Sequence, residues 1–215
     1  MGFDLWAIII NFLLIKINFM KKTIIFAATL FFMFSAKAQS THFGIKGGLN
    51  ASSLNSSPSI SDMQTKIGLN AGFLAHIHTA SELWAIQPEV YYSSEGAKSK
   101  SNSADKMELG YINVPVLVQY MFGNGFRVEA GPQVGFLMNA KAKQGGTSTD
   151  IKNDLKSAVF SIPVGLGYLT SSGLGFDARY NFGISNIYKD NTSKVHSNVF
   201  QFDIFYQFSG RKVIR

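Results

Sequence analysis

Two short sequences place an arginine and a carboxylate two residues apart. Arg127 and Glu129 lie in "FRVEA", and Asp177 and Arg179 lie in "FDARY". An acid and a base at this spacing can exchange protons with a substrate, and they can equally form ion pairs that only hold a fold together. Because both pairs alternate with apolar residues, we expect packed ion pairs and not acid–base catalysis.

Three of the four histidines offer metal chemistry. His42 opens one apolar segment, and His76 and His78 close the next. Antiparallel pairing of these segments brings His42 beside His76, and side chains two residues apart share a face of a strand. Imidazole nitrogens are common zinc and copper ligands, so a small metal site is one hypothesis. Histidines bonded to neighbours or water are the simpler alternative, and we predict no metal and no other cofactor.

The fourth histidine, His196, could act as the base for a serine nucleophile in a nearby loop. The sequence has no GxSxG motif, and no ordered set of serine, histidine and aspartate stands out. We therefore predict a protein that is not an enzyme. An outer-membrane enzyme that modifies lipids or cleaves proteins at its extracellular rim is the alternative.

The composition favours one β-rich domain. Of the 215 residues only 15% are charged, 20 are glycine, 19 are phenylalanine and none is cysteine, which excludes disulfides and thiolate metal sites. Residues 39–215 carry 16 basic and 12 acidic side chains, a net charge of +4. This scattered excess does not indicate binding to nucleic acid.

The sequence that begins at Met20, "MKKTIIFAATLFFMFSAKAQS", has the parts of a secretory signal peptide. Two lysines precede an apolar stretch, and a small-x-small cleavage pattern ends at Ala38. We predict a signal peptide over 20–38, cleavage between Ala38 and Gln39, and export through the Sec pathway. Residues 1–19 are interpreted as a misassigned upstream extension, and an uncleaved anchor is the alternative.

The remaining chain, 39–215, divides into eight segments in which apolar and polar side chains alternate. In "NVFQFDIFYQF", for example, Phe200 and Phe202 oppose Asp203, and Phe205 is an exception. Such alternation is typical of a strand with one apolar and one polar face. Prolines within the segments indicate bulges or strand ends. The segments are 42–50, 66–78, 83–92, 112–120, 126–136, 159–169, 174–185 and 198–208.

The connections between segments alternate in length. Short turns lie at Ser81–Glu82, Gly123–Gly125 and Ser171–Gly173, and longer polar connections separate the other neighbours. Short turns on one rim and long loops on the other are typical of an outer-membrane protein. We therefore predict an all-β fold, an eight-stranded antiparallel transmembrane β-barrel with an up-and-down meander. The short turns are expected on the periplasmic side and the long loops outside the cell.

In such a barrel the apolar face meets lipid and the polar face meets the lumen. A charge on the lipid side at mid-membrane would cost about 2–4 kcal/mol for arginine or lysine. The polar faces of the strands carry seven charged residues, which we predict to form a network in the lumen: Lys46, Glu89, Arg127, Glu129, Asp177, Arg179 and Asp203. Glycines on the same faces would leave room for these long side chains, so we expect a packed lumen and no wide pore.

Several strings resemble the small outer-membrane β-barrel family of Bacteroidota that is often called PorT-like. They are "FGIKGGLNAS", "IQPEVYYSSEGAK", "YINVPVLVQYMF", "EAGPQVGFL" and "FDIFYQF", and they follow one another in the expected order. The resemblance implies an eight-stranded barrel in the outer membrane. One group of members assists a protein secretion and gliding apparatus, and most members have no assigned activity.

These observations predict a structural or interaction component of the cell envelope, a rigid mount that assists secretion or transport machinery. The expected partners are outer-membrane lipid, lipopolysaccharide that meets the lysine-rich loops, and envelope proteins that contact the loops or the periplasmic rim. A soluble periplasmic barrel of the lipocalin kind, with apolar faces inside and a small apolar ligand, is a further alternative.

Overall fold

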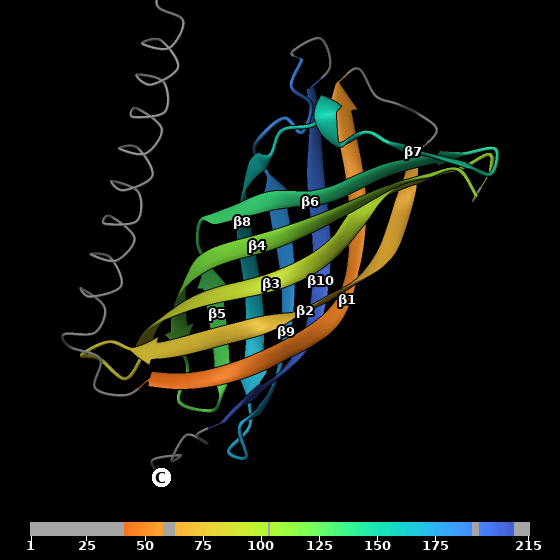
Figure 1. Cartoon of the computed structure of the whole chain (residues 1–215). Helices are drawn as coiled ribbons and strands as arrows, with labels where there is room; N and C mark the ends of the chain where they lie inside the picture. Colours follow the sequence, from red (N-terminus) through yellow and green to blue (C-terminus); the bar gives the residue numbers. More distant parts are fainter. Residues whose placement is uncertain (1–40, 58–62, 103, 191–193, 209–215) are drawn as a thin grey trace, which may run out of the picture. The chain divides into compact units, whose positions relative to one another are not determined.

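The computed structural model describes residues 41–57, 63–102, 104–190 and 194–208, all within the compact unit Gln39–Arg215 (Figure 1). The predicted signal peptide over 20–38, its cleavage point between Ala38 and Gln39, and the extension 1–19 lie outside the described residues. Within the described ranges, no helix is long and apolar enough to cross a membrane.

The described chain consists almost entirely of antiparallel strands. One short 3-10 helix, η1 (Lys152–Asp154), lies between two of them. The strands are β1 (Thr41–Ser57), β2 (Met63–His78), β3 (Trp84–Ser99), β4 (Lys106–Met121), β5 (Phe126–Ala130), β6 (Gln133–Gln144), β7 (Thr147–Asp150), β8 (Ala158–Leu169), β9 (Leu174–Gly183) and β10 (Lys194–Gln207).

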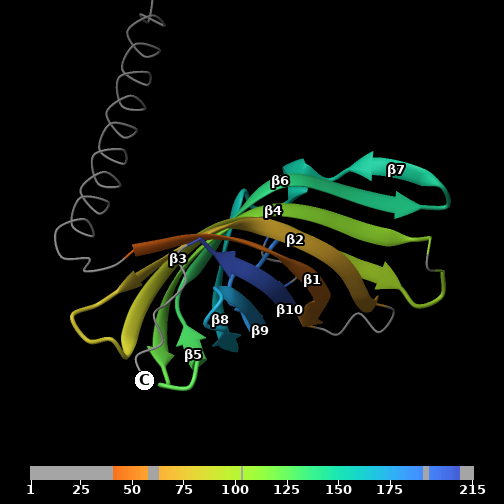
Figure 2. The same ribbon diagram turned by 90° about the horizontal axis from the view of Figure 1, so that it is seen from below.

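The strand pairings close a ring. β1, β2, β3, β4 and β5 pair in sequence, β5 pairs with β8, and β8, β9 and β10 follow in order. The pairing of β10 with β1 completes a ring through eight strands, and Figure 2 shows the curvature of this sheet. The predicted all-β antiparallel meander is therefore confirmed.

The predicted strand 126–136 is wrong as one continuous element, because it is interrupted between β5 and β6. Pro132 has no N–H and cannot donate to a ladder. At this point the Val116 N–H donates to the Pro132 carbonyl (3.0 Å), and the Gly131 N–H donates to the Pro163 carbonyl (3.2 Å). β6 then continues between β4 and β8, so the break keeps the same face toward the interior.

Several strands are longer than the alternation of side chains predicts. β3 continues to Ser99, β4 begins at Lys106, and the polar connection after β6 contains the extra strand β7. From Leu137 onward β6 no longer pairs with β8, and its far end pairs with β7 instead (Figure 1). Backbone ladders can continue where both faces are polar, and there the apolar–polar alternation disappears.

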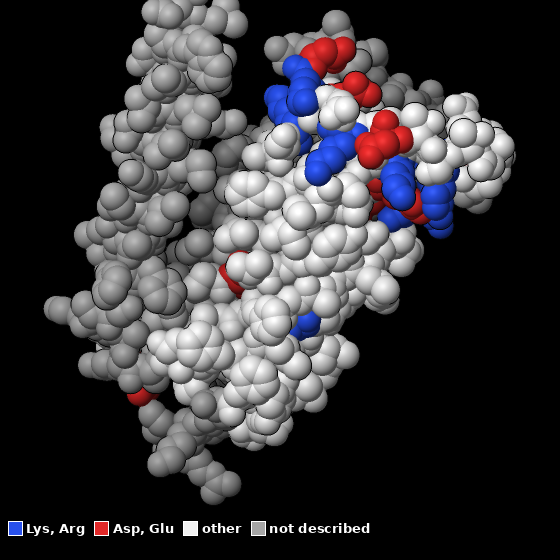
Figure 3. Space-filling model, viewed as in Figure 1, with Lys and Arg blue, Asp and Glu red and all other residues white. Residues whose placement is uncertain are grey.

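The outward faces of the ring are apolar. Phe73, Leu69 and Phe43 are 69%, 66% and 64% exposed, and most of the face in Figure 3 is uncharged. Aromatic pairs such as Trp84–Tyr120 and Phe126–Tyr168, each with ring centroids 5.0 Å apart, lie at the end with short turns. The lipocalin alternative is wrong, because it needs these apolar faces inside.

Two apolar clusters lie inside the ring, on either side of its polar residues. At the end with short turns, Leu74, Leu169 and Phe205 pack together, which explains why Phe205 breaks the alternation. The cluster toward the long loops is larger and contains Leu54, Ala97, Leu109, Tyr111, Leu137, Ala140, Leu155, Ile187 and Val195.

Two chain segments from the long connections fold onto the larger cluster. The Lys156 N–H donates to the Ile187 carbonyl (2.8 Å), and Leu155 forms an isolated bridge with Tyr188. Burial raises the pKa of the Tyr188 phenol, and Asp154 and Asp190 raise it further. The phenol therefore stays protonated at neutral pH, and it can pack at this end without a charge.

We predict that a methyl group at Gly175 destabilises the ring. A Cβ there would collide with the Phe205 ring. We expect Gly175→Ala to lower the free energy of unfolding by roughly 1–3 kcal/mol, as overpacking of a core does. The measurement is the midpoint of urea unfolding in detergent micelles. Gly123→Ala is the control, since nothing lies within 4 Å of a Cβ at that turn. Equal midpoints for the two variants would contradict the prediction.

Candidate functional site

The seven charged residues of the predicted network are all buried inside the ring. Six of them come from every second strand: Lys46 from β1, Glu89 from β3, Arg127 and Glu129 from β5, and Asp177 and Arg179 from β9. Asp203 on β10 is the seventh. Buried charges are stable only when they are paired and hydrogen-bonded, so their mutual contacts decide what the site can do.

Arg179 contacts three carboxylates. Its two terminal nitrogens each lie 2.8 Å from an oxygen of Glu89, which is a bidentate pair. Its Nη2 also lies 3.0 Å from Asp177 Oδ2, and its Nε donates to Glu129 Oε1. Bidentate arginine–carboxylate pairs are directional as well as strong, so they fix the orientation of both side chains.

Arg127 makes its shortest ion pair with Asp177 on β9, and not with Glu129 on its own strand. Its Nη2 lies 2.7 Å from Asp177 Oδ1, whereas its Nε is 3.9 Å from Glu129 Oε2. The guanidinium also lies over the Phe205 ring, 4.3 Å from the ring centroid. The short ion pair of Arg127 therefore joins β5 to β9 and does not link it to its neighbour Glu129 on β5.

Glycines on β8 explain how β5 reaches β9. Gly167 lies between Arg127 and Asp177 in the strand register, and Gly165 lies between Glu129 and Arg179. A Cβ at Gly167 would collide with the Asp177 carboxylate and would lie 2.8 Å from Arg127 Nε. The charged side chains meet above the bare backbone of β8.

Lys46 extends the network to β10. Its Nζ lies 2.6 Å from Asp203 Oδ2 and 3.0 Å from Glu89 Oε2, and it sits over the Tyr91 ring at 4.6 Å. Gly72 on β2 lies between Lys46 and Tyr91 in the register, as the glycines of β8 do for the other pairs. Asn70 Nδ2 donates to Asp203 Oδ1 (2.8 Å), so neutral side chains continue the network.

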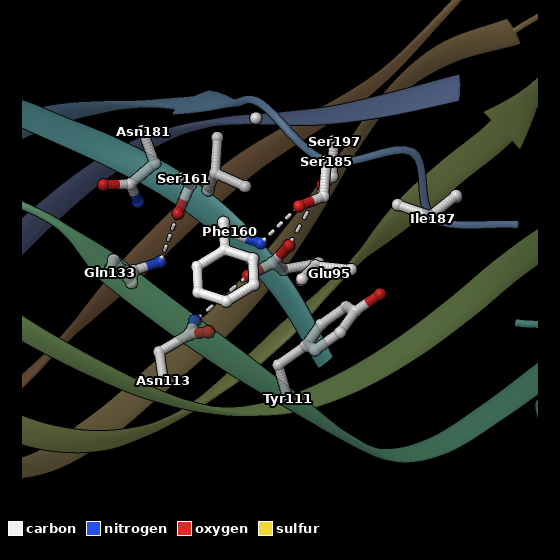
Figure 4. Close-up of a pocket in the computed structure, with 13 residues that line it drawn as sticks. Glu95, Tyr111, Asn113, Gln133, Phe160, Ser161, Asn181, Ser185, Ile187 and Ser197 are labelled. Atoms are coloured by element: carbon white, nitrogen blue, oxygen red, sulfur yellow. Dashed lines mark hydrogen bonds between the residues drawn. The ribbon is translucent and has the colours of Figure 1, made fainter. Parts of the chain in front are cut away.

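Glu95 is a buried carboxylate that the sequence analysis missed. It accepts hydrogen bonds from Ser93 (2.9 Å), Asn113 (3.3 Å) and Ser197 (3.1 Å), and the last two point toward it in Figure 4. It lines a cavity of about 20 Å³, which has room for one water molecule. The predicted strand ended at Tyr92, so Glu95 was placed in a polar loop.

The three histidines of the metal hypothesis do come together. His42 and His76 are register partners, and the His78 ring centroid lies 5.9 Å from that of His42 and 4.7 Å from that of His76. The rings meet edge to face, and His76 Nδ1 lies 3.3 Å from Gln87 Oε1. In the described part of the chain, no group of three or more His, Cys, Asp or Glu residues is arranged to hold a metal ion.

The enzyme alternative needs a hydrogen bond between His196 and a serine hydroxyl. Within the residues that the structure describes, His196 Nδ1 forms no such hydrogen bond. It lies on β10 opposite Asn55, and its Nδ1 is buried. Among the described residues this nitrogen has no hydrogen-bond partner. The arrangement of Arg127, Asp177 and Arg179, in contrast, is one of mutual ion pairs between apolar clusters, which can hold the ring together.

We predict that Arg179→Met destabilises the protein more than Arg127→Met. Arg179→Met removes an ion-pair partner from three buried carboxylates. In Arg127→Met, Asp177 loses one arginine but is still paired with Arg179. Breaking a buried pair by removing one partner costs about 3–5 kcal/mol. The measurement is the midpoint of urea unfolding in detergent, with the exposed Lys141→Met as the control. A midpoint for Arg179→Met equal to that of the control would rule out this network as a source of stability.

Comparison with known proteins agrees with this geometry. Residues 37–189 match the family model for the outer membrane protein beta-barrel domain. Neisserial surface protein A is similar with a TM-score of 0.56 and 15% identity, over 79% of this chain and 100% of that chain. The corresponding values for Ail, the attachment invasion locus protein of Yersinia pestis, are 0.50, 14%, 79% and 100%.

The two solved structures show a shared fold alone, since their sequence identities to this chain are low. No curated protein matches the chain. The family match covers most of the described strands and agrees with the ring of eight. The chain belongs to the outer membrane protein beta-barrel domain family and is a protein of the outer membrane.

Proposed function

We propose that this protein is a non-enzymatic structural or interaction component of the cell envelope, a rigid mount in the outer membrane. The observation that carries the proposal is the filled interior. Ion pairs centred on Arg179 connect β3, β5 and β9, and apolar clusters lie on both sides of them. Side chains that fill the interior in this way stiffen the ring and leave no room for a wide diffusion path.

The proposed partners are outer-membrane lipid, lipopolysaccharide and other envelope proteins. Lipid would contact the apolar outward faces, and envelope proteins would contact the loops or the rim with short turns. The long-loop end would face the outside of the cell. The strings that resemble the PorT-like family of Bacteroidota support a role beside secretion or transport machinery, without catalysis of its own.

The proposal includes export through the Sec pathway and removal of the signal peptide. We expect the mature protein from washed outer membranes to begin at Gln39, because Ala36 and Ala38 are the small residues of a cleavage pattern. N-terminal peptide mapping by mass spectrometry tests this. Recovery of peptides from 1–38 in the mature protein would favour the uncleaved-anchor alternative.

Lipid composition separates the proposed function from the enzyme alternative. We expect cells that lack the protein and cells that overproduce it to have the same lipid A and phospholipid species, measured by mass spectrometry. The control is a strain that overproduces His196→Ala, since His196 is the base of the enzyme alternative. A lipid species that appears on overproduction and disappears in the His196→Ala strain would contradict a non-enzymatic role.

Interaction partners can be sought in the same strains. A photo-crosslinking residue at Ser172, in a short turn, would sample one rim, and another at the exposed Gln144, at the far end of β6, would sample the other. Residue-specific adducts with envelope proteins from either rim would support the proposed role. Adducts with lipid alone from both positions would count against a protein partner.

A further inference from the structure

Three lysines form a row across the outer face of the strands beyond the ring. Lys98 on β3 is the register partner of Lys106 on β4, and Lys106 is the register partner of Lys143 on β6. Register partners in adjacent strands point to the same face. Ala97, next to Lys98, belongs to the interior cluster, and Met107, next to Lys106, packs against it. Side chains alternate between the faces of a strand, so these lysines, which we call the lysine row, point outward.

The lysine row is short of negative charge. Glu108 is shared, since its oxygens lie 2.8 Å from Lys106 Nζ and 3.0 Å from Lys143 Nζ. For Lys98 no ion pair exists among the described residues. Like charges directly opposite each other destabilise a sheet. Asp105 lines the same hollow as the lysines, but its Oδ1 accepts a hydrogen bond from the Gly145 N–H (2.9 Å), and among the described residues no ion pair joins it to the row. Three aligned lysines with one ion-paired carboxylate therefore favour a further anion on this face.

The position of the lysine row indicates which anion. Nearer the ring, the outer faces of the same three strands carry Tyr92, Val116 and Phe136, which are 41%, 37% and 47% exposed. Along each strand the outer face thus changes from apolar to basic. In an outer-membrane protein the apolar part faces hydrocarbon, so the lysine row lies on the headgroup side of that part. In Figure 3 the charged residues gather at one end of the face, and a white expanse adjoins them.

We propose that the lysine row binds the phosphate groups of the outer-leaflet glycolipid, lipid A. The ammonium groups supply mobile donors to the phosphate oxygens, and Glu108 holds Lys106 and Lys143 in place beside it. This inference deepens the proposed function, because it rests on the long-loop end facing outward. It names a partner and the three residues that recognise it.

The test uses the full mature protein folded in neutral detergent micelles. Diphosphoryl lipid A is added, and the temperature at which the compact band is lost in a gel is measured. We expect wild-type protein to shift to higher temperature, since a ligand that binds only the folded state stabilises it. We expect Lys98→Gln/Lys106→Gln/Lys143→Gln to lose this shift and to keep or raise its own lipid-free midpoint, because the repulsion is gone.

A matched control removes the same number of charges elsewhere. Lys152 Nζ donates to the Met138 carbonyl of β6 (2.8 Å), and Lys189 Nζ donates to the Asn153 carbonyl of η1 (2.6 Å). Lys156 lies between these two lysines in the sequence. The variant Lys152→Gln/Lys156→Gln/Lys189→Gln is expected to keep the shift caused by lipid A. If this control also lost the shift, the effect of lipid A would depend on the net charge of the protein and not on the lysine row. That result would overturn the proposal.

Two further probes identify the source of the phosphate. Dephosphorylated lipid A and inorganic phosphate are each expected to give no shift. An equal shift with either one, or no shift of wild-type protein with diphosphoryl lipid A, overturns the proposal. The thermal shift of purified protein tests lipid A binding, whereas the lipid composition of cells tests the non-enzymatic role. Either result can therefore contradict its own proposal without affecting the other.

Discussion

A guanidinium shielded from water must find acceptors for its N–H groups within the protein. Arg179 finds them on Glu89, Glu129 and Asp177. β9 and β3 lie on opposite sides of the eight-strand ring, so the bidentate pair with Glu89 ties facing walls together. The rest of the interior depends on this requirement, because each carboxylate that Arg179 neutralises is itself buried and needs a charged or hydrogen-bonding partner.

The same requirement explains where glycine occurs. An eight-stranded ring is only just wide enough for side chains to fill it, so long charged groups on every strand would not fit. The charges come mainly from alternate strands, and Gly72 on β2 and Gly165 and Gly167 on β8 lie between them in the register. Glycine normally weakens a strand. Here it is the condition that lets Arg127 reach Asp177 across β8.

The strand order and the inward faces were predictable because lipid on one side and a polar interior on the other impose a strict alternation. The partners of individual charges were not predictable, since Arg127 pairs with Asp177 through the gap at Gly167, a three-strand relation that no sequence spacing encodes. Glu95 was missed for a different reason. Beyond Tyr92 both faces of β3 carry polar residues, and the alternation signal ends although the backbone ladder continues.

The continuity of that ladder connects the interior to the outer surface. β3 and β4 run without interruption from the ring, where Glu89 is bound by Arg179, to the row that contains Lys98 and Lys106. Gly96 has a φ of +131°, and the β4–β6 register shifts between Gly110 and Tyr111. Such irregularities can re-aim a sheet without breaking it. A surface carried on paired strands keeps a fixed position and direction relative to the ring, which a flexible loop would not. The ion pairs inside the ring thus help to fix the orientation of the lysine row outside it.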